Sequence, residues 1–184
     1  MSKLAFFLIL LLTLSSTSMA DDDREEGFFG RLAEFGEHDD DHDEKSYIKP
    51  VTDPVYLEEC GSCHFAFQAE LLPSNSWKTM MGNLEEHFGE DASLEPDAKA
   101  QVEKYLYANA GDRSSSKRAR KFFRSSQGKN YQRITEIPYF IRKHDEVSPE
   151  VIKRPKIQSW ANCEACHGTA AKGIYSDDYV RIPK

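Results

Sequence analysis

Apolar residues recur at helical spacing over residues 76–88. Every third or fourth position is apolar there, namely Trp77, Met80, Met81, Leu84 and Phe88. This spacing predicts one helix with a single apolar stripe. His87 falls at the edge of the stripe, where a polar imidazole needs a hydrogen-bonding or metal partner.

Two prolines mark the starts of further helices. Asp53 before Pro54 is a capping residue followed by proline at the first helical position, and the predicted helix runs to residue 64. Pro96 opens a helix that reaches residue 109, and Gly111 is expected to end it. Its inner face consists of Val102, Leu106 and Ala110. We expect this helix to form an apolar lid over the region around residue 60.

The longest apolar run lies at the start of the chain. Residues 4–14 follow the positive Lys3 and lead to Ser18-Met19-Ala20, which resembles a cleavage site. This arrangement is typical of a secretory signal peptide. The run is shorter than the ~20 residues that span a bilayer. We therefore expect export to a bacterial-type periplasm, cleavage after Ala20, and no membrane insertion afterwards.

Charge is distributed unevenly over the remainder. Residues 21–46 hold twelve acids and three bases, whereas residues 47–184 hold nineteen acids and twenty bases. The acidic segment repels itself and cannot bury a core, so it is expected to be a disordered tail. Residues 113–130 are rich in Lys and Arg without any acid, which predicts a basic helix or linker. Nucleic-acid binding is disfavoured by the export signal and the acidic tail.

The four cysteines form two C-x-x-C pairs, each followed by histidine. The motifs are Cys60-Gly61-Ser62-Cys63-His64 and Cys163-Glu164-Ala165-Cys166-His167. This pattern indicates covalent haem attachment, because residues three and four apart share a helix face, so both thiols reach one porphyrin and the histidine reaches its iron. Two disulfides, a thioredoxin-type pair or a zinc ribbon are the alternatives, but a zinc ribbon separates its pairs by about 15–20 residues. We therefore predict two haem c groups, with His64 and His167 as proximal ligands.

Four further histidines are available for the other axial positions. His38 and His42 lie in the acidic tail, where solvated side chains are expected, with metal capture as an alternative. His87 and His144 remain, one in each half of the body. They are our predicted distal ligands.

Each distal assignment has competitors. Met80 and Met81, the only methionines after the signal peptide, compete with His87, although core packing explains them more simply. His87 is otherwise a core histidine bonded to a carbonyl. His144 is otherwise a surface histidine, and the second iron is then open or has an unusual ligand.

Histidine on both sides of an iron fills its coordination sphere and gives a lower potential than methionine would. Such irons suit electron transfer rather than oxygen binding, so the leading hypothesis is an electron carrier and not an enzyme. One alternative is a small haem peroxidase or reductase with one open iron, for which the second haem is the candidate. Another is a haem-based ligand carrier or sensor.

The chain also resembles the soluble dihaem cytochromes c that reduce sphaeroides haem protein. The resemblance is carried by DPVYLEECGSCHFAFQ (53–68), LLPSNSW (71–77), EHFG (86–89), RITEIPYF (133–140), KH (143–144) and SWANCEACH (159–167). It covers most of residues 47–183 and leaves the tail outside. It implies bis-histidine ligation at both irons, with His87 and His144 at the distal positions. It also implies a membrane cytochrome b as electron donor and an oxygen-binding monohaem cytochrome as acceptor.

We therefore expect a mainly α-helical fold with two small cytochrome c-type haem lobes of short helices and long loops. The expected parts are a signal peptide (1–20), an acidic tail (21–46), an N-terminal haem domain (47–112), a basic linker or helix (113–130) and a C-terminal haem domain (131–184). In the last domain, Trp160, Cys163 and His167 should share one face of a motif helix. The basic segment is a solvated linker, a partner of haem propionates, or a docking surface for an acidic protein.

Overall fold

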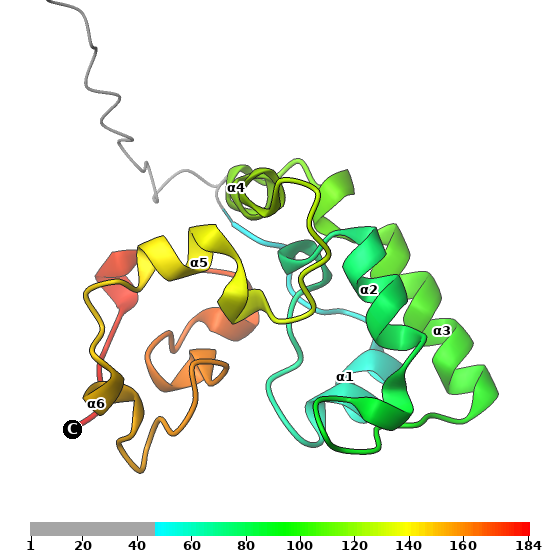
Figure 1. Ribbon diagram of the computed structural model, residues 1–184, viewed down its shortest axis with the longest axis horizontal. Helices are drawn as coiled ribbons and strands as arrows, with labels where there is room; N and C mark the ends of the chain where they lie inside the picture. The colour runs from blue at the N-terminus through cyan, green and yellow to red at the C-terminus, as the bar shows by residue number, and fades with distance from the viewer. Residues whose placement is uncertain (1–46) are drawn as a thin grey trace, which may run out of the picture. The chain divides into compact units, whose positions relative to one another are not determined.

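Short helices joined by long loops make up the part of the chain that the computed structural model describes, residues 47–184. The expected signal peptide and acidic tail lie outside the described residues. The α-helices in this part are α1 (Pro54–Gly61), α2 (Ser74–Met81), α3 (Pro96–Ala108), α4 (Lys117–Ser126), α5 (Pro138–Lys143) and α6 (Pro149–Ile152). Apart from two isolated bridges, these residues form no β-structure. The mainly α-helical fold class is confirmed (Figure 1).

Helix α1 begins as its sequence predicts. The Asp53 Oδ1 atom accepts a hydrogen bond of 2.9 Å from the Tyr56 backbone N–H, and Pro54 occupies the first turn. The helix ends at Gly61 and not at residue 64. Cys60 therefore lies in its last turn, and the remaining motif residues follow the helix.

The predicted single helix over residues 76–88 is wrong. Helix α2 ends at Met81, and Gly82 is its C-cap residue. The chain then forms the short 3-10 helix η3 (Leu84–Glu86) before it reaches His87. Glycine has a low helix propensity, so the helix stops there, while the apolar contacts continue because Leu84 remains only 9% exposed.

Helix α3 buries the face that its sequence predicts. Val102 and Leu106 are fully or almost fully buried, and the helix packs against α1 and α2. It ends at Ala108, so Gly111 does not end it. Glycine is needed at 111 because a Cβ atom there would overlap the Glu70 carbonyl oxygen.

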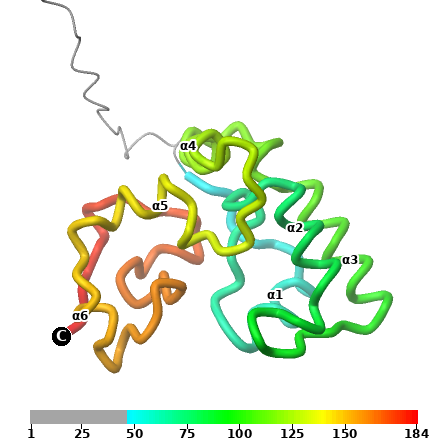
Figure 2. The backbone as a smooth tube through the Cα atoms, in the orientation of Figure 1, coloured from blue at the N-terminus to red at the C-terminus, as the bar shows by residue number. Residues whose placement is uncertain are grey.

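Helix α4 confirms that part of the basic segment is helical. It begins at a Ser116 cap, whose Oγ accepts a 3.3 Å bond from the Ala119 N–H, and it packs against α5. Figure 2 follows the chain from α5 through α6 into the long C-terminal loops. None of the helices in residues 47–184 is both long and apolar enough to cross a membrane.

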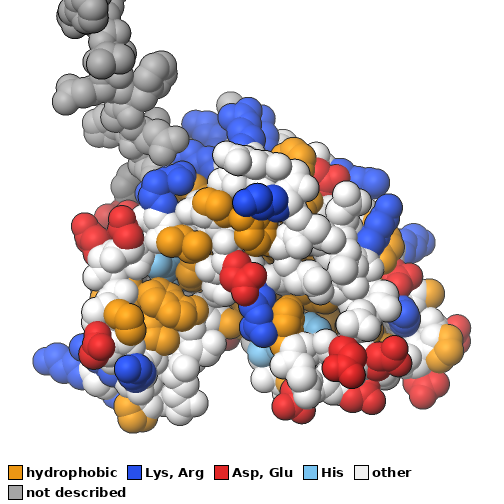
Figure 3. Space-filling model, in the orientation of Figure 1, with side chains coloured by type: hydrophobic (Ala, Val, Ile, Leu, Met, Phe, Trp, Pro, Cys, Tyr) orange, Lys and Arg blue, Asp and Glu red, His pale blue; other side chains and the backbone are white. Residues whose placement is uncertain are grey.

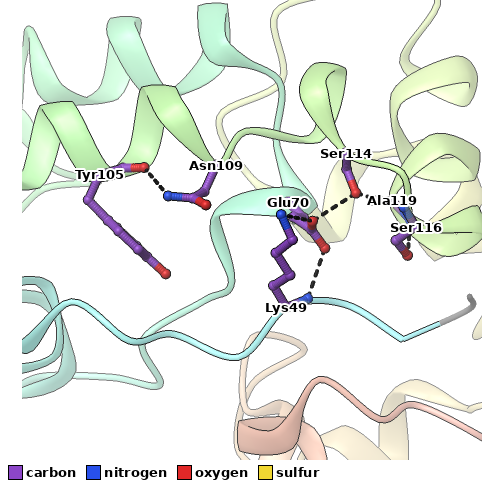
Figure 4. Close-up of polar contacts among 7 residues, drawn as sticks. All are labelled: Lys49, Glu70, Tyr105, Asn109, Ser114, Ser116 and Ala119. Carbon is purple, nitrogen blue, oxygen red and sulfur yellow. Dashed lines mark hydrogen bonds and ion pairs between the residues drawn. The ribbon is translucent and has the colours of Figure 1, made fainter. Parts of the chain in front are cut away.

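A buried carboxylate fastens three separate segments together. Glu70, only 2% exposed, lies in the 3-10 helix η2 (Ala69–Leu71). Its Oε2 accepts from the Lys49 N–H at 2.8 Å, and its Oε1 accepts from the Ser114 hydroxyl at 2.8 Å (Figure 4). The first described residues, η2 and the approach to α4 are thereby held in one place.

The two halves of the described chain are also joined directly. The Ile48 N–H donates to the Gly173 carbonyl at 3.0 Å. Gln68, which is fully buried, donates from Nε2 to the Ala170 carbonyl at 2.6 Å and accepts at Oε1 from the Tyr175 hydroxyl at 2.7 Å. Residues 47–184 accordingly fall within one compact unit, and the boundaries at 112 and 131 stay a prediction.

Candidate haem sites

The first site pairs His64 with His87. Their rings are stacked with centroids 6.1 Å apart and planes inclined by 20°. The Nδ1 atom of His64 is bonded to the Phe65 carbonyl at 2.7 Å. With the proton on Nδ1, the Nε2 atom keeps its lone pair for a metal.

His87 is held by a tight turn. Its N–H donates to the Glu90 carbonyl at 2.8 Å, and the Glu90 N–H returns a bond of 3.2 Å to the His87 carbonyl. Phe88, inside this turn, has a φ of 56°, a left-handed conformation that non-glycine residues adopt only where the surrounding structure enforces it. The turn therefore fixes the direction of the His87 ring at a conformational cost.

The second site pairs His144 with His167. Their ring centroids are also 6.1 Å apart, but the planes are inclined by 73°. His144 is the C-cap residue of α5, its Nδ1 is bonded to the Phe140 carbonyl at 2.8 Å, and its ring stacks on Phe140 at 4.0 Å. The sequence alone does not indicate that the His144 ring is half-buried against the Phe140 ring.

The spacing in both pairs fits a metal between the rings. A metal–imidazole nitrogen bond is about 2.0 Å long, and an imidazole nitrogen lies about 1.1 Å from its ring centre. An iron between two imidazoles therefore separates their centroids by about 6 Å, and both pairs measure 6.1 Å. No group of three or more His, Cys, Asp or Glu side chains gathers as a metal site in residues 47–184.

The second motif does not lie on an α-helix, contrary to expectation. Only the 3-10 helix η6 (Cys163–Ala165) forms there. The Asn162 amide donates to the Ile157 carbonyl at 3.0 Å and so bends the preceding chain. The Cys163 carbonyl accepts from the Cys166 N–H at 3.2 Å and from the His167 N–H at 2.8 Å, so the motif forms one tight turn. The motif thus needs one helical turn and no longer helix.

The four thiols are free of disulfides. Burial raises the pKa of Cys60 and that of Cys163 to about 11, so both stay protonated near neutral pH. Redox-active C-x-x-C pairs depend on a lowered thiol pKa instead. This electrostatic setting disfavours the thioredoxin-type alternative.

The half-buried imidazoles of His87, His144 and His167 are held in the neutral form that ligates metals. Burial lowers the pKa of His167 to about 4, with the charges of His144 and Arg118 adding to the effect. Burial also lowers the pKa of His87 and of His144. Neutral rings leave a nitrogen lone pair available at physiological pH.

A cavity of about 420 Å³ borders both motifs. Gly61 and His64 line it from the first motif, and Glu164 lines it from the second. Gln68, whose amide joins the two halves, is also part of the lining. The two motifs therefore face a common space.

Three residues at these sites were not identified by the sequence reasoning. Tyr175 packs its ring against His167, with centroids 5.4 Å apart, and its hydroxyl is held by Gln68. Arg118 lies within electrostatic range of His167. Gln68 is the last residue of the motif 53–68 that carries the resemblance, and Arg118 lies in the basic segment for which pairing with haem propionates was an alternative. Tyr175 carried no signal.

Comparison with known proteins identifies the family. The family model for dihaem cytochrome c matches residues 56–175. A dihaem cytochrome c structure from Rhodobacter sphaeroides is 45% identical, with a TM-score of 0.61, covering 70% of this chain and 99% of that one. A second structure from the same organism is 44% identical, with a TM-score of 0.56, covering 68% and 99% of the respective chains.

A dihaem cytochrome type c from Shewanella baltica is 40% identical, with a TM-score of 0.58, covering 71% of this chain and 92% of that one. No curated protein matches the chain at a significant level. The chain belongs to the dihaem cytochrome c family. It accordingly carries two haem c groups, and the cysteine pairs at 60/63 and 163/166 fit their attachment.

Proposed function

We propose that this protein is an exported electron carrier whose two irons are each ligated by two histidines. The observation that carries the proposal is the presence of two imidazole pairs with the same 6.1 Å spacing. In each pair, one histidine belongs to a C-x-x-C-H motif and the other comes from a distant segment. His64 with His87 ligate the first iron, and His144 with His167 ligate the second.

The occupied axial positions of the two irons limit the reactions that the protein can carry out. An iron with two imidazole ligands has no position for oxygen, peroxide or nitrite, so it exchanges electrons without binding a substrate. The common cavity at Gly61 and Glu164 supports a short path between the haems. His64 Nδ1 and His144 Nδ1 are bonded to backbone carbonyls. These hydrogen bonds fix the orientations of the two imidazole rings, so the rings need not move when the iron is oxidised or reduced.

The partners and the compartment are part of the same proposal. Residues 1–20 support export to the periplasm. By resemblance, electrons come from a membrane cytochrome b-type donor and pass to a soluble oxygen-binding monohaem cytochrome. Within the chain, residues 47–112 and 131–184 act as two haem domains, with the basic residues 113–130 between them.

Carbon monoxide binding tests directly whether the sixth coordination position of each iron is occupied. Added to the dithionite-reduced holoprotein, it should leave the Soret band unchanged, because both sixth positions are occupied. Carbon monoxide binding at one haem per chain would overturn the assignment there and favour a small peroxidase or reductase. The mass of the same sample should exceed that of the polypeptide by two haems, and its N-terminus should be Asp21.

Substitution of a ligand tests each site separately. His144→Ala should keep both haems attached but convert one to high spin with a free sixth position. His87→Met should raise the potential of the first haem alone. His42→Ala, in the acidic segment, is the matched control and should change neither spectrum nor potential. An unchanged spectrum in His144→Ala would remove that residue as a ligand.

A further inference from the structure

The loop that carries His87 lies at the surface of the molecule. His87 is half-buried, whereas residues 85, 86 and 88–90 around it are exposed. Histidine side chains reach the surface on the face that Figure 3 shows, with hydrophobic and charged side chains beside them. Core packing therefore fixes the direction of the His87 ring less firmly than it would in a buried segment, so contacts at the surface have more effect on it.

This loop closes as a two-residue turn that contains an unfavourable residue. His87 and Glu90 exchange backbone hydrogen bonds of 2.8 and 3.2 Å. The two residues between them have positive φ angles, 56° at Phe88 and 101° at Gly89. Positive φ at both central positions is required for a type I′ turn, where glycine, asparagine and aspartate are preferred. A phenylalanine keeps this conformation only where other contacts compensate for the strain.

Arg133 supplies such a contact from a distant segment. Its guanidinium carbon lies 3.9 Å from the centre of the Phe88 ring, and the Phe88 ring contacts the His87 ring, with centroids 4.7 Å apart. Arginine stacks well on aromatic rings because its guanidinium is planar and weakly hydrated. The Glu136 carboxylate, 3.6 Å from Arg133 Nε, holds the guanidinium from its own segment. A row of contacts thus runs from Glu136 to the imidazole of His87.

The segment that carries Arg133 is itself anchored in the core. Arg133 directly precedes the 3-10 helix η5 (Ile134–Glu136). Ile134 and Ile137 are 9% and 0% exposed, and η5 packs against α5. Helix α5 ends with His144 as its C-cap residue. One packed segment therefore carries Arg133 at its start and the predicted distal ligand of the second iron at its end.

We propose that Arg133 is a positioning residue for the first haem, because its stacking on Phe88 holds the strained turn that directs His87 to the iron. The inference rests on the proposed ligation of the first iron by His87. Without the guanidinium, the turn leaves its left-handed conformation more often, and the imidazole leaves the iron more often. A cation–aromatic contact of this kind corresponds to about a 2- to 30-fold change in that equilibrium.

The ring planes allow each haem to be followed separately. In ferric haems with two imidazoles, near-parallel rings split the iron d orbitals strongly and give a rhombic electron paramagnetic resonance spectrum. Near-perpendicular rings leave two orbitals nearly degenerate and give one feature at high g. The angles of 20° and 73° therefore assign the rhombic signal to the first haem and the high-g signal to the second.

The experiment is a cyanide titration of the ferric holoprotein, followed by these two signals. Cyanide competes with the distal imidazole for ferric iron, so its apparent Kd falls as His87 leaves the iron more often. In Arg133→Gln, the Kd at the rhombic haem should fall about 2- to 30-fold, and the Kd at the high-g haem should not change. Loss of a nearby cation would by itself weaken binding of the cyanide anion, so tighter binding reports the ligand and not the charge.

A control and a ligand variant make the result specific. Arg120→Gln, at an exposed position on α4, is the matched control and should change neither Kd. Unchanged or weaker cyanide binding at the first haem in Arg133→Gln, or an equal gain at both haems, would refute the role of Arg133. His87→Ala should convert the rhombic haem to high spin. A rhombic signal retained in His87→Ala would contradict the proposed ligation and not the stacking.

A double-mutant cycle tests whether Arg133 acts through the Phe88 ring. Phe88→Leu removes the ring but keeps a residue that is strained at positive φ, so it should also lower the cyanide Kd at the first haem. Adding Arg133→Gln to Phe88→Leu should have no further effect, because the contact is already lost. Additive effects would overturn the proposed route. If Arg133→Gln fails to fold, Phe88→Leu still decides, and an unchanged Kd in that variant would refute the proposal.

Discussion

The hydrogen bond between Tyr175 and Gln68 provides the most direct test of how the two halves are held together. Tyr175→Phe removes the hydroxyl and keeps the ring that packs on His167. The lost bond is 2.7 Å long, and it leaves the Oε1 atom of a fully buried Gln68 without this donor. Leaving one buried polar partner unsatisfied costs about 1–3 kcal/mol, so we expect a loss of about 2 kcal/mol.

The assay is equilibrium unfolding of the holoprotein in guanidinium chloride, followed by far-ultraviolet circular dichroism. With a denaturant dependence of about 4 kcal/mol/M for a chain of this size, a loss of about 2 kcal/mol lowers the midpoint by about 0.5 M. Tyr179→Phe is the matched control, because its side chain is 53% exposed and its hydroxyl can bond to water in either state.

A double-mutant cycle sharpens the result. Gln68→Met alone should also destabilise the protein, because the Ala170 carbonyl loses its 2.6 Å donor as well. The double variant with Tyr175→Phe should be less destabilised than the sum of the single variants by about 1 kcal/mol or more, since the partners are removed together. Additive effects, or a midpoint in Tyr175→Phe equal to that of Tyr179→Phe, would refute the reasoning.

Four further substitutions test other parts of the fold, each measured by the same unfolding assay. Gly173→Ala should prevent stable folding, because φ is 71° and the new Cβ would overlap the Ile48 carbonyl oxygen; normal stability would show that this contact is not needed. Glu70→Ala should cost about 3 kcal/mol or more, since it removes two hydrogen bonds to a charged group, each worth about 1.5–3 kcal/mol. Lys49→Ala should cost under about 1 kcal/mol, because the Lys49 side chain is 67% exposed and its Nζ lies 3.9 Å from that carboxylate. Asp53→Ala should cost about 1 kcal/mol through the lost cap, and no change would remove the capping argument for α1.

Much of the helical structure could be predicted, because its signals are local. The Asp53-Pro54 cap lies next to the helix that it starts, and the buried face of α3 follows from spacing alone. The helix expected over residues 76–88 was wrong because the apolar spacing continues beyond Gly82, where the helix has already ended. Residues after Gly82 still pack in the same core, so apolar spacing alone does not reveal the end of the helix. Gly111 was misread for a similar reason, since its role depends on Glu70, forty-one positions earlier in the chain.

The candidate site shows the same division between local and distant information. Proximal ligation by His64 and His167 is a prediction from their motifs, and distal ligation by His87 and His144 is a prediction by elimination among few candidates. The ring angles, the Gln68–Tyr175 bond and the place of Arg118 depend on contacts between segments far apart in sequence. Nothing in the local pattern around these residues indicates which partner they meet.

The hydrogen bonds of the Gln68 amide affect the order in which parts of the chain fold. Its two partners lie 102 and 107 positions further along the chain, so the link cannot close until residues up to Tyr175 are available to fold. Contacts of such wide separation are slow to form. The thiols at 60 and 63 therefore remain for an interval on a chain whose two halves are not yet joined, and haem attachment at these thiols is less hindered during that interval.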